Sequence, residues 1–312
     1  MRVQNNRVSL DSLGVLRARG ADVIAFLQGQ LSNDMSRVAP DRSLMAGYHN
    51  PQGRAIALLR FVALAADDLL AIVPRELAAP VAGRLAKFIL RAKVKLSDES
   101  TQWSVEGVLA AEAVNGAADV LTNLRPARPG GVLRAGDARI VRIGESGARL
   151  LVVRPAAAPS LLGSLTEGTL QEWRLGAIAA GEPEVYAATS EQFVAQMLNL
   201  DVLGAIAFDK GCYTGQEVIA RAHYRGRVKR RMQRFVTHAP RALRPGDSAE
   251  LTDGRSFKIV EAAQHADGRC EFLAVGAMGG PDAVSGALEP AAGSAASVID
   301  ATQLDLPYVL PE

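Results

Sequence analysis

The chain has 312 residues, which is more than one average domain and predicts two or three packed units. Apolar residues make up 48% of it and charged residues 22%, so the composition is that of a globular protein and argues against an intrinsically disordered chain. A formal net charge of +2 argues against strong attraction of the whole molecule to nucleic acid or to anionic membranes. Any preference for anions must therefore come from a local cluster of charges.

The first hundred residues predict a mixture of short helices and strands. Their amino-terminal segment lacks the continuous apolar stretch of a signal peptide. The most apolar window, residues 57–73, is broken by Arg60, Asp67 and Asp68, and predicts two strands joined by a turn rather than a membrane span. In chain order we expect a short helix ending at Gly29, strands at about 54–65 and 69–73, a helix from Pro74 to about Arg91, and a strand at 92–96.

The middle of the chain interleaves strands and helices without a regular alternation. Strand patterns occupy residues 103–110, 131–144 and 148–154, and the alanine-rich residues 111–124 predict a helix between the first two of these. Two more helices are expected at about 159–167 and 169–181, the second carrying Trp173 and Arg174. This order favours an α+β fold over a doubly wound parallel sheet.

From residue 229 onwards the pattern changes to short strands separated by Gly, Pro and Asp turns. The strand candidates are residues 230–238, 247–251, 256–264 and 270–278. Residues 279–297, rich in Ala, Gly and Pro, are expected to form a long loop because this composition buries little apolar area. We therefore expect a small all-β domain at the carboxyl end.

Cys212 is the first candidate for chemistry. It stands shortly before a helix predicted over residues 216–225 and next to Lys210, and both the helix dipole and an ammonium group favour a thiolate. The alternative, a small buried side chain that only fills space, is equally supported by these patterns. Gly211 and Gly215 permit a close backbone approach or a positive φ, as a ligand-binding turn requires, but any tight turn needs glycine.

Two cysteines and no metal-ligand spacing give no support for a zinc site or a self-contained iron–sulfur cluster, and they suit a reducing compartment, the cytoplasm. The arginines after the cysteine offer an anion-binding pocket, with Arg221, Arg225 and Arg227 as candidates. A continuous nucleic-acid surface is not expected, because helix and strand positions in this run point to different sides.

These residues resemble a known family. The motif KGCYTGQE at 210–217, with MLNLDVLGAIAF before it and ARAHYRG after it, closely resembles the signature of the YgfZ family of folate-binding proteins. That family is related to the aminomethyltransferase (T-protein) of the glycine cleavage system. Residues 19–34, 171–183 and 304–312 resemble further family segments in the same order, so the resemblance covers most of the chain.

The resemblance implies a three-domain, T-protein-like arrangement around a central opening that receives tetrahydrofolate or a derivative. Residues 1–228 would form two interleaved α+β domains, the second centred on about 100–170, and residues 229–312 a small β-barrel. It also implies a cytoplasmic accessory factor, without membrane or direct nucleic-acid partners, for the assembly or repair of iron–sulfur proteins that act in tRNA modification.

The resemblance further implies roles for single residues. Cys212 matches the functional thiol, and Trp173, Asn33 and Asp34 match positions associated with folate. The neighbours of the thiol in the motif are Lys210, Gly211, Tyr213, Gly215, Gln216 and Glu217.

Two departures from the family patterns limit the expected chemistry. A second tryptophan position corresponds to Leu13, so one flat face for the folate rings is missing. The paired aspartates of the T-protein correspond to Ala57 and Leu58, so aminomethyl transfer by its mechanism is not expected. A folate-dependent one-carbon transferase remains the alternative function, and an RNA-binding module a third.

Overall fold

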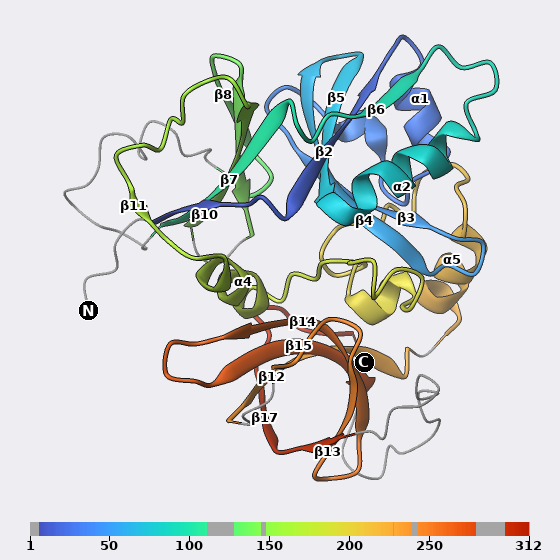
Figure 1. The fold of residues 1–312 in the computed structure, drawn as a ribbon. Helices are drawn as coiled ribbons and strands as arrows, with labels where there is room; N and C mark the ends of the chain where they lie inside the picture. The colour runs from blue at the N-terminus through green and yellow to red at the C-terminus, as the bar shows by residue number, and fades with distance from the viewer. Residues whose placement is uncertain are drawn as a thin grey trace.

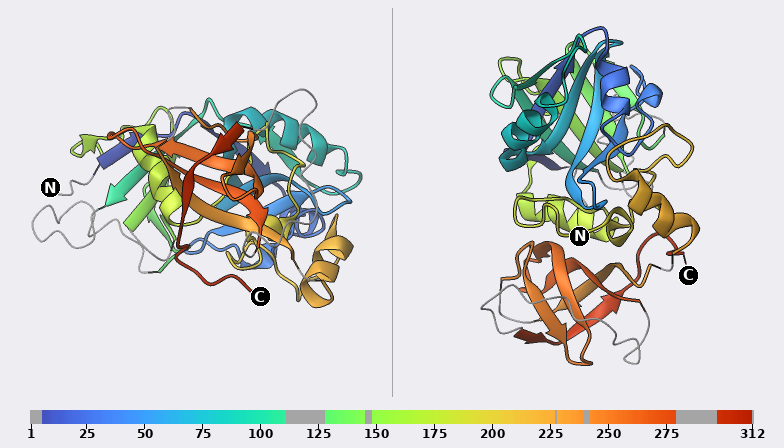
Figure 2. Two further views of the ribbon diagram at one scale, coloured as in Figure 1. Left: turned by 90° about the horizontal axis from the view of Figure 1, so that it is seen from below. Right: turned by 90° about the vertical axis from the view of Figure 1, so that its right-hand side faces the viewer.

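The computed structural model describes residues 6–110, 128–144, 148–226, 228–238, 242–278 and 297–311. The protein has an α+β fold built on three sheets. Helix α4 (Leu170–Ala179) lies with two of the sheets on one side of it and the third on the other (Figures 1 and 2). Among the described residues, no helix is long and apolar enough to cross a membrane.

The first sheet has five antiparallel strands in the order β3-β4-β5-β2-β6. Its strands are β2 (Leu13–Arg19), β3 (Leu44–His49), β4 (Ala55–Ala65), β5 (Asp68–Pro74) and β6 (Lys95–Asp98). The strands predicted at about 54–65 and 69–73 are thereby confirmed, whereas the one expected at 92–96 lies further along the chain.

Two helices accompany this sheet. Helix α1 (Val23–Gln28) ends at Gly29 as predicted, with Val23, Phe26 and Leu27 buried. Helix α2 (Arg75–Ala86) stops five residues before the expected end at Arg91. Beyond Ala86 the apolar residues of the pattern no longer reach the core, since Phe88 and Leu90 are 51% and 88% exposed. Continuing the helix would therefore bury little more apolar surface.

The second sheet has six strands in the order β11-β1-β7-β10-β9-β8, so the first strand of the chain pairs with strands that follow β6. Its strands are β1 (Asn6–Ser9), β7 (Trp103–Ala110), β8 (Val132–Ala135), β9 (Ala138–Ile143), β10 (Ala148–Pro155) and β11 (Thr166–Glu167). The helix expected at about 159–167 is wrong, because this stretch forms turns that end in β11. The helix expected over 111–124 lies outside the described residues.

The third sheet curls into a nearly closed barrel in the order β16-β13-β14-β15-β12-β17 (Figure 1). Its strands are β12 (Arg230–Thr237), β13 (Ser248–Leu251), β14 (Ser256–Gln264), β15 (Cys270–Ala277), β16 (Ser297–Ile299) and β17 (Ala301–Leu304). The first four match the predicted strands. The last two were not predicted, and the loop expected at 279–297 lies outside the described residues except for its last residue.

Helix α4 (Leu170–Ala179) connects the three sheets. Thr169 and Glu172 form a capping box that fixes its first turn, because each side chain accepts a hydrogen bond from the backbone of the other residue. Trp173 of this helix joins the apolar cluster formed where the first two sheets pack together. The predicted domain boundaries at about 100, 170 and 228 stay a prediction.

Candidate functional site

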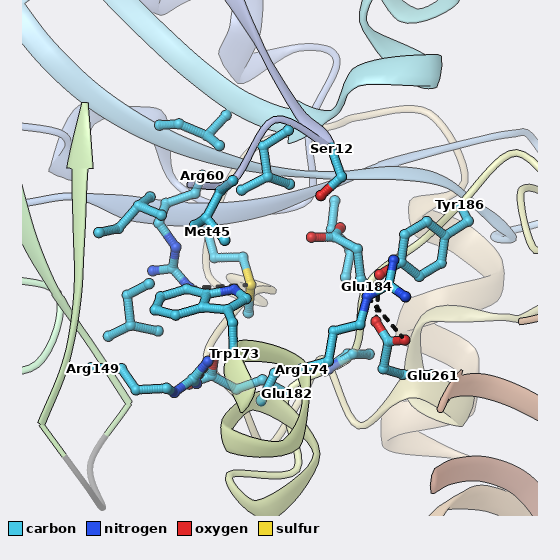
Figure 3. Close-up of a pocket in the computed structure, with 18 of the residues that line it drawn as sticks. Ser12, Met45, Arg60, Arg149, Trp173, Arg174, Glu182, Glu184, Tyr186 and Glu261 are labelled. Atoms are coloured by element: carbon cyan, nitrogen blue, oxygen red, sulfur yellow. Dashed lines mark hydrogen bonds and ion pairs between the residues drawn. The ribbon is translucent and has the colours of Figure 1, made fainter. Parts of the chain in front are cut away.

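A pocket opens where the three sheets meet, and α4 forms one of its walls (Figure 3). Its lining comes from β2 and the loop before it, from β3, β4 and β5, from β9 and β10, from α4 and the loop after it, and from β14 of the barrel. The space free of atoms is about 840 Å³, including the open mouth.

Trp173 provides the flat surface of the pocket. Its ring lies against Gly107 of β7, where a Cβ atom would stand 2.5 Å from the ring atom Cε3, so only glycine leaves room for this position. The guanidinium carbon of Arg149 lies 5.3 Å from the ring centroid, a cation–π distance. The ring is 9% exposed and lines the pocket, so it can meet a ligand with a limited part of its surface.

Arg60, on β4, also lines the pocket. Among the described residues its side chain donates to the sulfur of Met45 at 3.9 Å and has no carboxylate within ion-pairing distance. Burial lowers the pKa of its guanidinium, while the charge of Glu182 works in the opposite direction. Arginine nevertheless remains protonated at neutral pH, so the pocket contains a positive charge without a direct counter-ion.

Two carboxyl groups enter from the loop after α4. Glu182 pairs with Arg149 at 2.5 Å. Glu184 accepts a single hydrogen bond, at 3.2 Å from the backbone N–H of Val185, and burial raises its pKa to about 8. At neutral pH Glu184 therefore presents a protonated carboxyl, which can both donate and accept a hydrogen bond.

A third carboxyl belongs to the barrel. Glu261 of β14 accepts a hydrogen bond from the Tyr186 hydroxyl, and Arg174 of α4 lies 4.0 Å away. Burial raises the pKa of Glu261, and burial together with the charge of Glu261 raises that of Tyr186, which keeps its proton. In Figure 3 this group and Glu184 lie to the right of the Trp173 ring, and Arg60 and Met45 lie next to the ring itself.

A second pocket adjoins the first and shares three lining residues with it, namely Met45, Arg60 and Glu182. Its other walls include Arg42, residues 202–204 and Tyr308. Its space free of atoms is about 1170 Å³, including the open mouth. The three shared residues therefore stand at the boundary between the two pockets.

Of the two residues expected at the T-protein aspartate positions, Leu58 lines the first pocket, whereas Ala57 is fully buried and does not. Leu13, expected at the second tryptophan position, lines the first pocket as well. The first pocket thus has leucines at positions 13 and 58, and its carboxyl groups come from other elements.

Cys212 is exposed and lines neither of these pockets, whereas Cys270 is buried in the barrel core. The interpretation of Cys212 as a buried filler is therefore wrong. Lys210, expected to favour its thiolate, donates instead to the carbonyl oxygens of Gln28, Leu31 and Asn33 at 2.7, 2.6 and 3.0 Å.

The rest of the motif is fixed by packing. Tyr213 is buried, and its ring centroid lies 5.0 Å from the Lys210 ammonium. Burial lowers the pKa of that ammonium to about 8. Gly215 has a φ of 84°, and a Cβ atom there would stand 2.5 Å from the carbonyl oxygen of Asn50. Gly211 has open space around its Cβ position, so the structure demands glycine only at Gly215.

Helix α5 (Gln216–Tyr224) carries the end of the motif at the surface. Gln216 begins the helix, and Glu217 pairs with Arg221 at 2.7 Å, with both side chains largely exposed. Arg225 is exposed as well, and neither it nor Arg221 lines either pocket. Arg227 lies outside the described residues.

Asn33 and Asp34 lie in a turn held by internal hydrogen bonds. The Asn33 amide donates to the carbonyl oxygens of Met45 and Gly204, at 2.7 and 2.8 Å, which ties the turn to the wall of the second pocket. Asp34 accepts from Ser36, and these bonds lower its pKa. Lys210 is thus connected through Asn33 to the second pocket. Neither Asn33 nor Asp34 lines either pocket.

Sequence reasoning identified Trp173 but missed the charged residues around it. Arg60 left a signal, since it is a charge inside an otherwise apolar strand. Glu184 and Tyr186 left none, because they belong to an irregular loop without periodicity. Within the described ranges, no group of three or more His, Cys, Asp or Glu residues could hold a metal ion.

Comparisons with known proteins agree on fold and family. No model of a protein family matches the chain. The tRNA-modifying protein YgfZ of Escherichia coli O157:H7 (strain EC4115 / EHEC) is 31% identical over 273 residues, which are 84% of this chain and 82% of the relative, and the YgfZ of strain K12 gives the same values.

The fold is that of the glycine cleavage system aminomethyltransferase T from Bartonella henselae, with a TM-score of 0.69 at 14% identity over 88% of this chain and 79% of that one. The predicted T-protein-like α+β fold is confirmed. Because the identity to the curated relatives extends over most of both chains, this chain belongs to the YgfZ family.

Proposed function

We propose that this protein is a tetrahydrofolate-binding accessory factor in tRNA modification, acting through the assembly or repair of iron–sulfur proteins. The observation that carries the proposal is the pocket at Trp173, which combines a flat ring with buried groups that donate, accept and carry charge. Its relatives are named as tRNA-modifying proteins, which supports the biological process. The fold shared with aminomethyltransferase T supports a folate as the ligand.

The chemistry of the pocket suits a reduced pterin. The ring system of tetrahydrofolate presents N–H donors and a carbonyl acceptor along one edge. A protonated Glu184 offers an acceptor and a donor to such an edge, and Glu261 offers further acceptors. The Trp173 ring supplies a surface on which an aromatic part of the ligand packs.

The thiol of Cys212 would act on a partner rather than on the folate. Cys212 is exposed and outside both pockets, while the other cysteine is buried in the barrel. A cluster held at Cys212 even briefly would need its other ligands from a second chain or from a small thiol. This supports a helper of iron–sulfur proteins over a protein with its own cluster.

Complementation of cells that lack the protein tests this proposal. We expect Cys212→Ala to fold, to bind tetrahydrofolate with unchanged affinity, and to fail to restore the activity of an iron–sulfur enzyme that modifies tRNA. The matched control is Cys270→Ala, which removes the buried cysteine and should restore that activity. Full rescue by Cys212→Ala would refute the functional thiol, and a wild-type protein without measurable tetrahydrofolate binding would refute the folate role.

One observation favours a folate-dependent one-carbon transferase as a second candidate. Glu184 places in the pocket a carboxyl whose raised pKa suits proton transfer near neutral pH, although the aspartate positions are occupied by Ala57 and Leu58. Turnover of 5,10-methylenetetrahydrofolate by the wild type, abolished in Glu184→Gln, would support this candidate. Stoichiometric binding without turnover would support the accessory factor.

A further inference from the structure

Charge is distributed unequally between the two adjoining pockets. The first pocket is lined by the carboxyl groups of Glu182, Glu184 and Glu261 together with several arginines. The second is lined by Arg42 and Arg60, and its single carboxylate, Glu182, already pairs with Arg149. The first pocket therefore suits an uncharged polar group, and the second suits an anion.

The two arginines of the second pocket are free to bind that anion. Within the described part of the chain, neither Arg42 nor Arg60 has a carboxylate within ion-pairing distance. Burial of the Arg60 guanidinium without a counter-ion is costly, and an anionic ligand group removes that cost, whereas Arg42 is exposed and needs no such compensation. Planar bidentate hydrogen bonding to a carboxylate is the interaction for which arginine is best shaped.

The order of these groups along the site gives a direction to the ligand. Figure 3 shows Glu184 and Glu261 to the right of the Trp173 ring and Arg60 next to the ring itself. Arg60 stands at the boundary with the second pocket, and Arg42 lies beyond it in that pocket. Following the site from Glu184 to Arg42, a ligand meets donors and acceptors first, then an aromatic surface, then two cations.

We propose that the second pocket binds the glutamate tail of the folate, with Arg60 holding the first glutamate and Arg42 meeting glutamates further along a γ-linked chain. This inference rests on the proposed function, and it makes folates with several glutamates the preferred ligands. It also places the tail away from Arg221 and Arg225, which were predicted as anion-binding residues but lie on exposed helix α5 outside both pockets.

Isothermal titration with three ligands tests the inference: the methylamide of tetrahydropteroate, which has neither a glutamate nor a charged carboxylate, tetrahydrofolate with one glutamate, and its triglutamyl form. We expect wild-type affinity to increase along this series. Arg60→Met should lose about 10- to 100-fold in affinity for both glutamylated ligands, because a charge-assisted hydrogen bond is lost, and nothing for the uncharged methylamide. Arg60→Lys should retain part of the preference.

Arg42→Met provides an independent arm, because Arg42 is exposed and its loss should not disturb folding. We expect it to remove the gain of the triglutamyl form over the monoglutamyl form and to leave the latter unchanged. Arg221→Met is the matched control and should bind all three ligands as the wild type does.

The outcomes separate the inference from the function on which it rests. If the wild type binds none of the three ligands, the proposed function fails. If it binds them and the Arg60 and Arg42 variants keep the wild-type preference for glutamates, folate binding stands and the tail site is wrong. A loss of that preference in Arg221→Met would move the tail to helix α5 and overturn the inference in the same way.

Discussion

The buried carboxyl of Glu184 couples folding to pH. In the unfolded chain its pKa is near the usual 4.5, and in the folded protein burial raises it to about 8. Between these values the unfolded state binds fewer protons, so the contribution of Glu184 to stability is complete below pH 4.5 and is lost as the pH rises to about 8. The free energy of unfolding should fall by up to about 1.4 kcal/mol per pH unit in this window.

Glu184→Gln removes this titration and should flatten the decline. Chemical denaturation of both proteins between pH 5 and pH 9 measures the difference, because the two stability curves should diverge towards high pH with the variant the more stable. Some decline should remain in the variant, since the pKa of Glu261 is also raised by burial. Parallel curves for the two proteins would contradict the assignment.

Whether the sequence reveals a single site residue depends on whether neighbouring residues in the chain determine its place. Trp173 could be identified because it matches a family position, and it lies in a helix that the sequence also predicts. Arg60 was noticed only as a charge that breaks an apolar window, since nothing local indicates which cavity faces it. Glu184 and Glu261 are 77 positions apart by their numbers and meet only when the barrel packs against α4.

Among the elements, helix α5 shows how one glycine sets the position of the cysteine motif. Gly215 caps this helix with a φ of 84° and packs against the Asn50 carbonyl. Gly215→Ala combines a left-handed backbone, which costs an L-residue about 1–2 kcal/mol, with a Cβ contact of 2.5 Å to backbone that cannot easily move. We expect a loss of at least that size in the free energy of unfolding.

Gly211→Ala is the matched control in the same motif. Its Cβ position meets no atom within 4 Å, and its φ is not positive, so the change in stability should stay within about 0.5 kcal/mol. Equal destabilisation by the two substitutions would show that the motif depends on glycine for a reason other than this packing.

The elements that were predicted well are those whose local pattern and tertiary environment agree. Helices α1, α4 and α5 have apolar faces that are buried in part, and β12 to β15 are strand-length runs separated by turns. The stretch 159–167 has helical spacing, but it forms turns, and these turns bury Leu162 in an apolar cluster with strand residues. Strands β16 and β17 are three and four residues long, too short to leave a periodic signal.

In the whole molecule, the barrel is joined to the other sheets through the edge of the pocket. Tyr186, in the loop after α4, donates to Glu261 of the barrel, and Arg174 of α4 lies near the same carboxylate. A second link runs from the backbone N–H of Gln264 to the side-chain oxygen of Gln171, at 3.0 Å. The docking of the barrel and the shape of the pocket therefore depend on the same groups.

Tyr186→Phe tests this dependence by removing one hydroxyl. The buried carboxyl of Glu261 loses its donor, which should cost about 1–3 kcal/mol of stability. That hydrogen bond lowers the pKa of Glu261 against the effect of burial, so its loss raises the pKa further, and the stability difference between wild type and variant should be larger at pH 9 than at pH 5. Because Glu261 lines the pocket, the affinity for tetrahydrofolate should fall together with stability.

Arg269→Ala, which breaks an exposed ion pair with Asp267 on the barrel, should change neither quantity measurably. If Tyr186→Phe behaved like Arg269→Ala, the barrel would dock independently of the pocket.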